Sequence, residues 1–119
     1  MAKPISKSLM GATSMLMILS ILKQKDSYGY EISKILFKES DGRIDWQAGS
    51  LYPILKKMEK QGLIKSDWLI EDNSRARRYY TILDKGLEKM DELREDWQLL
   101  CTILNKLLVN AGAEPITKE

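Results

Sequence analysis

The sequence predicts a mainly α-helical chain with one small β-hairpin. Three segments come first in which apolar residues recur at the three- and four-residue spacing of helices. Two short runs rich in Trp, Tyr, Ile and Thr follow, separated by a polar stretch typical of a turn. A fourth and longer helical pattern comes after them. With 119 residues, 44% hydrophobic and 30% charged, the chain has the size and composition of one folded domain.

The first helix is predicted from Lys7 to Lys25 and is apolar on more than one side, as in a helix packed against several neighbours. Its apolar run of about 14 residues is shorter than the ~18 of a membrane span. No small-residue cleavage site follows it. We therefore expect a buried helix and no membrane partner. Asp26 and Ser27 are predicted to cap a second helix that ends near Glu39.

The third helix lies in the stretch GSLYPILKKMEKQGLI, residues 49–64, and is predicted to end at Gly62. The first four amide groups of a helix have no partner within it, so a proline among them costs little. Pro53 therefore predicts that this helix starts near Gln47 to Ser50, or that it is kinked. Its inward face is apolar at helical spacing: Leu51, Ile54, Leu55 and Met58.

The two strands of the hairpin are predicted at 63–70 and 77–83, joined by the polar turn EDNSRA. The long helix follows from about Asp84 to Val109 and carries a broad apolar stripe with alternating spacings of three and four residues. A domain of this size cannot cover such a stripe alone, so we expect a second copy of the chain to cover it. Residues 111–119 are predicted to form a flexible tail.

Three helices followed by a hairpin is the order of a winged helix-turn-helix. In helix-turn-helix proteins the N-terminal residues of the second helix of the motif contact DNA. The charge pattern is compatible with such a partner: residues 1–80 carry 14 Lys or Arg against 9 Asp or Glu, while 81–119 carry 5 against 8. We therefore divide the chain into a winged helix-turn-helix over 1–83, a dimerisation helix over 84–110 and the tail.

The residue types argue against catalysis. The sequence has no histidine, which removes the commonest general base and the commonest metal ligand. Cys101 is the only cysteine, so neither an intrachain disulfide nor a cysteine metal cluster can form. Without a glycine-rich phosphate loop or a paired-carboxylate motif, we expect neither an enzyme nor a bound cofactor or metal. The lone cysteine on an apolar stripe fits a cytoplasmic, reducing location.

Three motifs resemble the PadR-like family of transcriptional regulators when taken in order and spacing: YGYEI at 28–32, GSLYPILKKMEKQGLI at 49–64 and RRYY at 77–80. The resemblance covers roughly residues 9–110 and points to the short subgroup with a single C-terminal helix. It implies a dimeric winged-helix repressor whose C-terminal helix packs against its partner. In some members a hydrophobic ligand enters at the dimer centre.

The resemblance also assigns residues. Ser50, Tyr52 and Pro53 match the start of the family's recognition helix, and Arg77 and Arg78 match the basic residues that open the second wing strand. Two stretches depart from the family pattern. The wing tip reads NSRAR where many members have a glycine-rich stretch with a proline, and TILDKG replaces a junction that usually bears arginine and threonine.

The predicted sites follow from these assignments, and each has a simpler alternative. Ser50 could instead cap the helix, Tyr52 could lie at the edge of the core, and the lysines and arginines could be solvated. The predicted DNA-binding residues are Gln47, Ser50, Tyr52, Pro53, Lys56, Lys57, Arg75, Arg77 and Arg78. The predicted dimer interface comprises Met90, Leu93, Trp97, Leu100, Cys101, Leu104 and Leu108.

Two functions of different classes remain open at this stage. The first is a sequence-specific transcriptional regulator, a ligand-responsive repressor that binds a pseudo-palindromic operator in double-stranded DNA as a homodimer. Trp97 and Met90 would then flank an opening for a small planar hydrophobic effector, although plain dimer core is the alternative for Trp97. The second is a winged helix used for protein–protein contact with a membrane or signalling protein. A steep loss of DNA binding with salt would favour the first.

Overall fold

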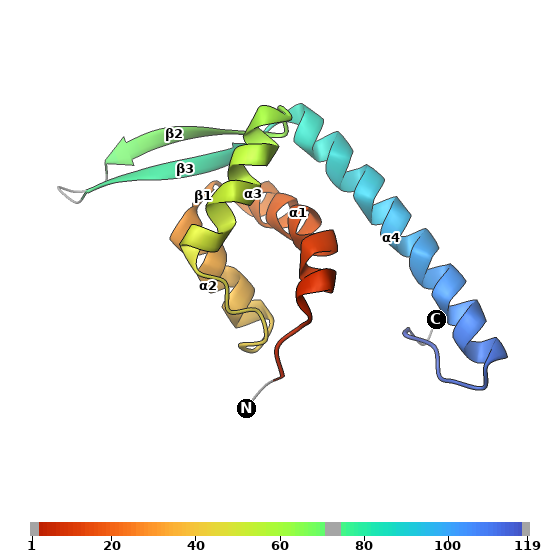
Figure 1. Ribbon diagram of the computed structural model, residues 1–119. Helices are drawn as coiled ribbons and strands as arrows, with labels where there is room; N and C mark the ends of the chain where they lie inside the picture. The colour runs from red at the N-terminus through yellow and green to blue at the C-terminus, as the bar shows by residue number, and fades with distance from the viewer. Residues whose placement is uncertain (1–2, 71–74, 118–119) are drawn as a thin grey trace.

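The computed structural model describes residues 3–70 and 75–117. Within them the chain forms four helices and a three-stranded sheet (Figure 1). In chain order the elements are α1 (Lys7–Gln24), β1 (Ser27–Tyr28), α2 (Gly29–Glu39), α3 (Ala48–Lys60), β2 (Ile64–Ile70), β3 (Ala76–Ile82) and α4 (Asp84–Asn110). The predicted mainly α fold with a small hairpin is confirmed, and each predicted helix and hairpin strand has a counterpart.

The hairpin forms the wing, and its base belongs to the core. β2 and β3 pair antiparallel from Ile64 opposite Ile82 to Ile70 opposite Ala76. The three N-terminal helices pack together beside the base of the hairpin, where α2 contacts both α1 and α3, and α1 also lies against α4 (Figure 1). Residues 71–74, where most of the wing turn was predicted, lie outside the described residues. The most deeply buried apolar side chains come from the three helices and the first residue of β2: Ile18, Leu19, Leu22, Ile32, Leu51, Leu55, Met58 and Ile64.

The connection between α1 and α2 differs from the prediction. Ser27 and Tyr28 form a short strand that pairs with Tyr80 and Tyr79 of β3, so the sheet has the order β1-β3-β2. α2 begins only at Gly29, and no side-chain hydrogen bond caps it. The predicted capping by Asp26 and Ser27 is therefore wrong, because this backbone pairs with a strand about fifty residues away.

Helix α3 begins at Ala48, within the predicted range, but the reason differs from the one expected. Pro53 lies inside the helix rather than among its first four residues. It cannot donate the hydrogen bond that the carbonyl of Gly49 would accept in a regular helix. At the start of the helix, the Ser50 amide donates a hydrogen bond of 2.9 Å to the Gln47 carbonyl, three residues before it, which closes the first turn. The exposed side of this end of α3 thus contains a carbonyl without its usual helical partner.

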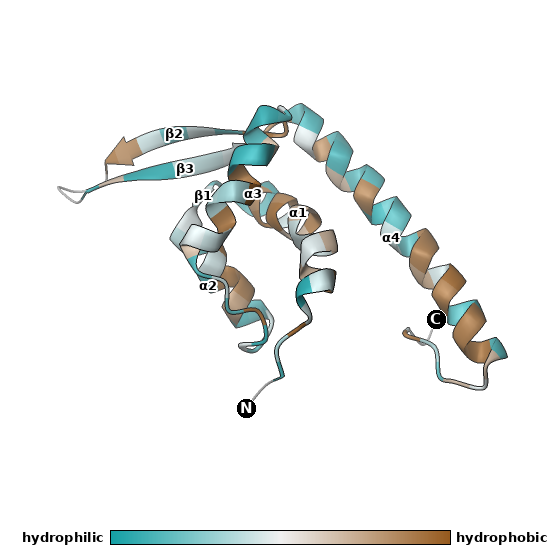
Figure 2. Cartoon of the chain, in the orientation of Figure 1, coloured by the Kyte–Doolittle hydropathy of each residue, from teal (hydrophilic) through white to brown (hydrophobic). Residues whose placement is uncertain are grey.

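Helix α4 leaves the body of the protein and gives the molecule its elongated shape, 59 × 36 × 22 Å (Figure 1). Its first half lies against α1, where Met90 and Leu93 pack on the core. Its second half is rich in hydrophobic residues (Figure 2). Large apolar side chains are exposed there: Leu99, Leu100, Ile103, Leu104, Leu107 and Val109. None of the helices in the described parts of the chain is both long and apolar enough to cross a membrane.

The chain bends back after α4. Gly112 has a φ of +78°, and the Ala113 amide donates to the Leu108 carbonyl over 2.8 Å, which closes the helix end. Further on, the Asn105 side chain accepts a bond of 2.7 Å from the Ile116 amide and donates one of 3.0 Å to the Thr117 hydroxyl. The flexible tail and the domain boundaries stay predictions, but the tail up to Thr117 folds against α4.

Candidate nucleic-acid interface

Helix α3 presents its N-terminal turns to solvent on the side opposite its buried face. Gln47, Ser50, Tyr52 and Pro53 are exposed, whereas Leu51 is fully buried. Gln47 precedes the helix as its N-cap, and no side chain forms a capping bond there. The alternative that Ser50 serves as a cap is therefore wrong. Its hydroxyl and the Tyr52 ring stand on the same exposed end of the helix.

Tyr52 is held in place by the first residue of α2. The side chain is 50% exposed, and its ring lies against Gly29. A Cβ atom at position 29 would lie 3.1 Å from Cε1 of the tyrosine, which is closer than an ordinary van der Waals contact. Only a residue without a side chain lets the ring lie this close to the start of α2.

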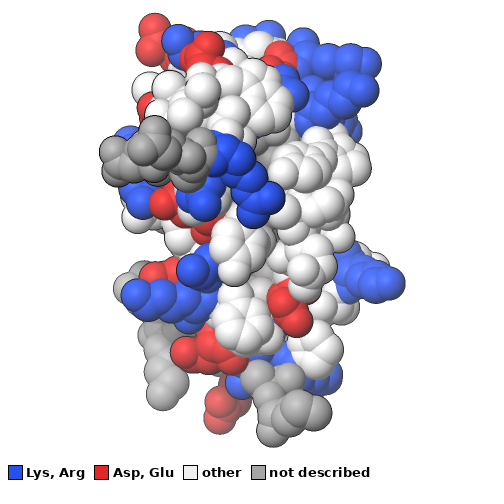
Figure 3. Space-filling model, turned by 90° about the vertical axis from the view of Figure 1, so that its left-hand side faces the viewer, with Lys and Arg blue, Asp and Glu red and all other residues white. Residues whose placement is uncertain are grey.

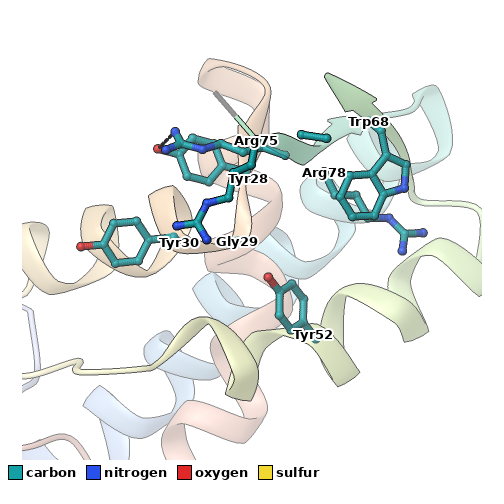
Figure 4. A pocket seen from close by; sticks show the side chains of 9 residues that line it. Tyr28, Gly29, Tyr30, Tyr52, Trp68, Arg75 and Arg78 are labelled. Atoms are coloured by element: carbon teal, nitrogen blue, oxygen red, sulfur yellow. Dashed lines mark hydrogen bonds between the residues drawn. The ribbon is translucent and has the colours of Figure 1, made fainter. Parts of the chain in front are cut away.

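A hollow of about 390 Å³ separates the start of α2, the start of α3 and the wing. Figure 4 shows Tyr30, Tyr52 and Trp68, from three different elements, around this space. The hollow exists because β1 has only two residues and pairs with Tyr79 and Tyr80 alone, which leaves that edge of β3 uncovered further toward the wing tip. The remaining lining residues are Tyr28, Gly29, Arg75, Ala76, Arg77 and Arg78.

Arg77 is anchored to β1. Its Nη1 donates to the Tyr28 hydroxyl over 2.8 Å, the bond drawn in Figure 4, and its guanidinium carbon lies 4.5 Å from the centre of that ring. The Tyr28 ring in turn meets the Tyr79 ring edge to face, with 5.2 Å between centroids. This stacked set fixes the guanidinium group beside the hollow.

Arg78 is anchored to α3 instead. Its Nε donates to the Ser66 hydroxyl over 2.8 Å, and its Nη2 lies 3.3 Å from Oε1 of Glu59. The same guanidinium lies over the Tyr80 ring, 5.9 Å from its centroid. A second hollow of about 390 Å³ opens beside it, lined by Tyr52, Lys56, Glu59, Trp68, Arg78 and Tyr80.

Arg75 differs from both of its neighbours. It is exposed and makes no hydrogen bond or ion pair with another described residue. Lys56 and Lys57 of α3 are exposed as well. On this side of the molecule, Lys and Arg side chains, with several Asp and Glu side chains among them, border an uncharged strip (Figure 3). The face therefore combines basic groups with aromatic rings, as surfaces that bind nucleic acids do.

The structure groups some of the predicted DNA-binding residues more closely than others. Around the two hollows it brings together Tyr52, Lys56, Arg75, Arg77 and Arg78. Gln47 borders a different hollow, of about 740 Å³, along α2. The remaining three are exposed on α3 but line none of these spaces: Ser50, Pro53 and Lys57.

Five residues of this face were not singled out from the sequence: Tyr28, Tyr30, Glu59, Ser66 and Trp68. Part of this grouping could have been predicted from the sequence. Alternate residues of a strand point to the same face, which puts Ser66 and Trp68 together. The pairing of Trp68 with Arg78 and of Ser66 with Tyr80 was not visible, because it depends on the register of the hairpin.

The predicted dimer residues lie in two different settings. Met90 and Leu93 pack against the core of their own chain. Trp97, Cys101 and Leu108 are half-buried, while Leu100 and Leu104 are exposed. Among the residues described, no group of three or more His, Cys, Asp or Glu could hold a metal ion.

The fold and this face define a winged helix-turn-helix protein. Residues 18–92 match the model of the transcriptional regulator PadR-like family. The chain belongs to this family.

Solved structures of PadR-like proteins are similar over most of the chain. A PadR-like transcriptional regulator from Bacillus cereus is 35% identical with a TM-score of 0.75, over 86% of this chain and 97% of that one. A transcriptional regulator from Clostridium thermocellum is 34% identical with a TM-score of 0.78, over 86% and 96%.

A third relative is known with its DNA. The negative transcriptional regulator PadR of Bacillus subtilis is 32% identical over 82 residues, which are 67% of this chain and 42% of that protein. Its structure in complex with operator DNA has a TM-score of 0.58 and 28% identity, over 72% of this chain and 47% of that one. The chain therefore spans less than half of this relative.

Proposed function

We propose that the protein is a sequence-specific DNA-binding repressor of transcription. The observation that carries this proposal is the single face on which the N-terminal turns of α3, the basic wing and the aromatic hollow lie together. The operator complex of the related Bacillus subtilis regulator supports it. The family consists of regulators rather than enzymes, and we assign the chain no catalytic role and a cytoplasmic location.

In this proposal α3 enters the major groove and the wing contacts the flanking backbone. Ser50 and Tyr52 stand on the exposed first turns of α3, the part of a recognition helix that meets base edges. Gln47 and Pro53 flank them. Lys56, Lys57 and Arg75 supply exposed positive charges for phosphate groups. The aromatic hollow lies between these two sets of contacts.

The test is binding to duplexes selected from a random pool, followed by fluorescence anisotropy over a range of salt concentrations. We expect a pseudo-palindromic site with half-sites about one helical turn, or a multiple of it, apart. We also expect a steep linear fall of log affinity with log salt, because the released counterions set that slope. Equal affinity for every duplex would contradict a specific repressor. No measurable duplex binding would favour the protein–protein module instead.

The pseudo-palindromic site requires a homodimer, which we propose to form through α4. The support is the row of exposed aliphatic side chains on its second half, which α1 does not reach. Soluble proteins rarely leave such a surface uncovered. A second copy of the chain offers the same row in the symmetric arrangement that most homodimers adopt.

We propose further that a planar hydrophobic effector binds at the dimer centre beside Trp97. The half-buried indole lies where α4 departs from the core, with Met90 seven residues before it. A ligand there would bind the two arrangements of the long helices differently and so change operator affinity. Titration of planar dyes tests this by indole quenching and operator affinity. Quenching unchanged by Trp97→Phe, or dyes that never alter operator affinity, would leave Trp97 as dimer core.

A further inference from the structure

We propose that Glu59 is a positioning residue for the wing. Through Arg78 and Ser66 it fixes the angle between α3 and the hairpin, so that Arg78 supports DNA binding by holding geometry rather than by contacting a phosphate. The inference rests on the proposed DNA-binding function, and it concerns how that face is held together.

The contacts form a closed ring of three side chains from three elements. Glu59 on α3 uses both carboxylate oxygens: Oε2 accepts a bond of 3.0 Å from the Ser66 hydroxyl on β2, and Oε1 lies 3.3 Å from Nη2 of Arg78 on β3. Arg78 completes the ring by donating its Nε to the Ser66 oxygen over 2.8 Å. Each member therefore contacts the other two, and the ring ties both strands of the wing to α3.

The closed ring formed by Glu59, Ser66 and Arg78 is partly protected from solvent. The Glu59 side chain is 28% exposed and that of Arg78 is 45% exposed. The guanidinium also lies over the ring of Tyr80, which is buried in the core. Side chains held on several sides lose less freedom on binding than free ones, and they can hold an angle between two elements.

The charge of Glu59 supports a structural role. It is the only acidic residue of α3, which also carries Lys56, Lys57 and Lys60. A carboxylate on a helix that faces DNA repels phosphate, so on charge alone it would weaken binding. In this proposal the bonds of Glu59 to Ser66 and Arg78 favour DNA binding by more than its repulsion of phosphate opposes it.

The neighbouring arginines show the contrast. Arg75 has no bond to another described residue, so its guanidinium remains available for a phosphate. Arg78 already has its Nε and Nη2 engaged by Ser66 and Glu59. Arg75 is thus available to contact a phosphate, whereas Arg78 supports the position of the wing, although the two residues are close together in the sequence.

The decisive experiment is Glu59→Ala, because the two explanations predict opposite signs. Removal of a negative charge should tighten operator binding if only charge matters. Loss of the ring should weaken operator binding, by roughly fivefold for a partly exposed network of this kind, with the salt slope unchanged. Glu88→Ala removes the same charge from an exposed site on α4 and serves as the control, with affinity unchanged.

Arg78→Ala and Arg75→Ala separate support from phosphate contact. We expect Arg78→Ala to weaken binding as much as Glu59→Ala and to leave the salt slope unchanged. Arg75→Ala should lower the slope by roughly one. The double variant Glu59→Ala/Arg78→Ala should bind no more weakly than Arg78→Ala alone, since either change opens the ring.

Three results would overturn the inference: tighter binding by Glu59→Ala, a slope lowered by Arg78→Ala, or fully additive losses. A measurement without DNA separates these outcomes from failure of the proposed function. The urea midpoints of the two single variants and the double variant should be non-additive, because the ring exists in the free protein. Additive midpoints would refute the ring even if the native chain bound no duplex.

Discussion

The α3–wing face and the second half of α4 are both exposed, but their side chains are held in opposite ways. On the first, Arg77 has a partner on β1, and Arg78 has partners on β2 and α3. On the second, side chains such as Leu99 and Leu107 project without apolar cover. The arginine side chains of the first surface are held by their own chain, whereas the aliphatic side chains of the second need another apolar surface to remove them from water.

We expect the largest effect from charged substitutions on the exposed apolar surface of α4. Leu100→Glu combined with Leu104→Glu would place two carboxylates per chain in the proposed dimer interface. Burying an unpaired charge is so costly that we expect association to weaken by more than about a thousandfold. Sedimentation velocity at micromolar concentration should change from dimer to monomer. Gln98→Glu adds a charge at an exposed position outside the predicted stripe and should leave the dimer intact; a native chain that already sediments as a monomer would contradict the proposal.

We expect the next largest effect from a substitution where α4 meets the base of the wing, between the two surfaces. Gly86 is buried in the first turn of α4, and a Cβ atom there would meet the Leu63 carbonyl and lie 2.8 Å from Cγ1 of Ile82. Gly86→Ala must therefore push α4 away from the base of the wing, and we expect it to destabilise the fold by about 2–3 kcal/mol. Urea unfolding measures this loss.

Gly11→Ala is the matched control for that variant. Gly11 lies in a helix as well, but apart from the neighbouring backbone of that helix no atom of the described residues lies within 4 Å of its added Cβ. Alanine there should stabilise the protein by about 0.5–1 kcal/mol through helix propensity. Equal effects of the two substitutions would show that the junction is not tightly packed.

A smaller effect sharpens the description of the α3–wing face. Tyr52→Ala should weaken specific more than non-specific DNA binding, by about 1–2 kcal/mol, if the ring meets base edges. Gly29→Ala leaves the tyrosine in place but forces its ring to move, and we expect a loss of about 1 kcal/mol at most. Anisotropy titrations with the operator and with a scrambled duplex measure both variants. If Gly29→Ala had no effect, Tyr52 would not depend on α2 for its position.

The two surfaces also differ in how much of each can be predicted from the sequence. Periodic spacing sufficed for the helices, because that pattern is local. The strand at Ser27 and Tyr28 was missed, because two residues carry no period and their pairing partner is distant. The predicted start of the third helix, near Gln47 to Ser50, is confirmed, but Pro53 lies beyond its first four residues, because the helix start is set by packing as well as by local propensity.

Within the α3–wing face, residue types predicted which side chains take part but not what each one does. Arg75, Arg77 and Arg78 are equivalent by composition. Their partners decide their roles, and Glu59 lies 19 positions before Arg78 in the chain. Only the register of the hairpin and its packing on α3 bring such residues together.

The smallest effect concerns pH and again involves Arg78. Burial raises the pKa of Tyr80 above its usual 10.0, and the nearby Arg78 charge partly opposes the increase. The unfolded chain then releases this proton at lower pH than the folded chain, so the folded state loses stability as pH rises through the folded pKa. Absorbance at alkaline pH should show one late-ionising tyrosine, absent in Tyr80→Phe. In Arg78→Ala that late phase should move to still higher pH, because the opposing positive charge is gone. An unchanged late phase in Arg78→Ala would show that the guanidinium does not lie close to Tyr80 in solution.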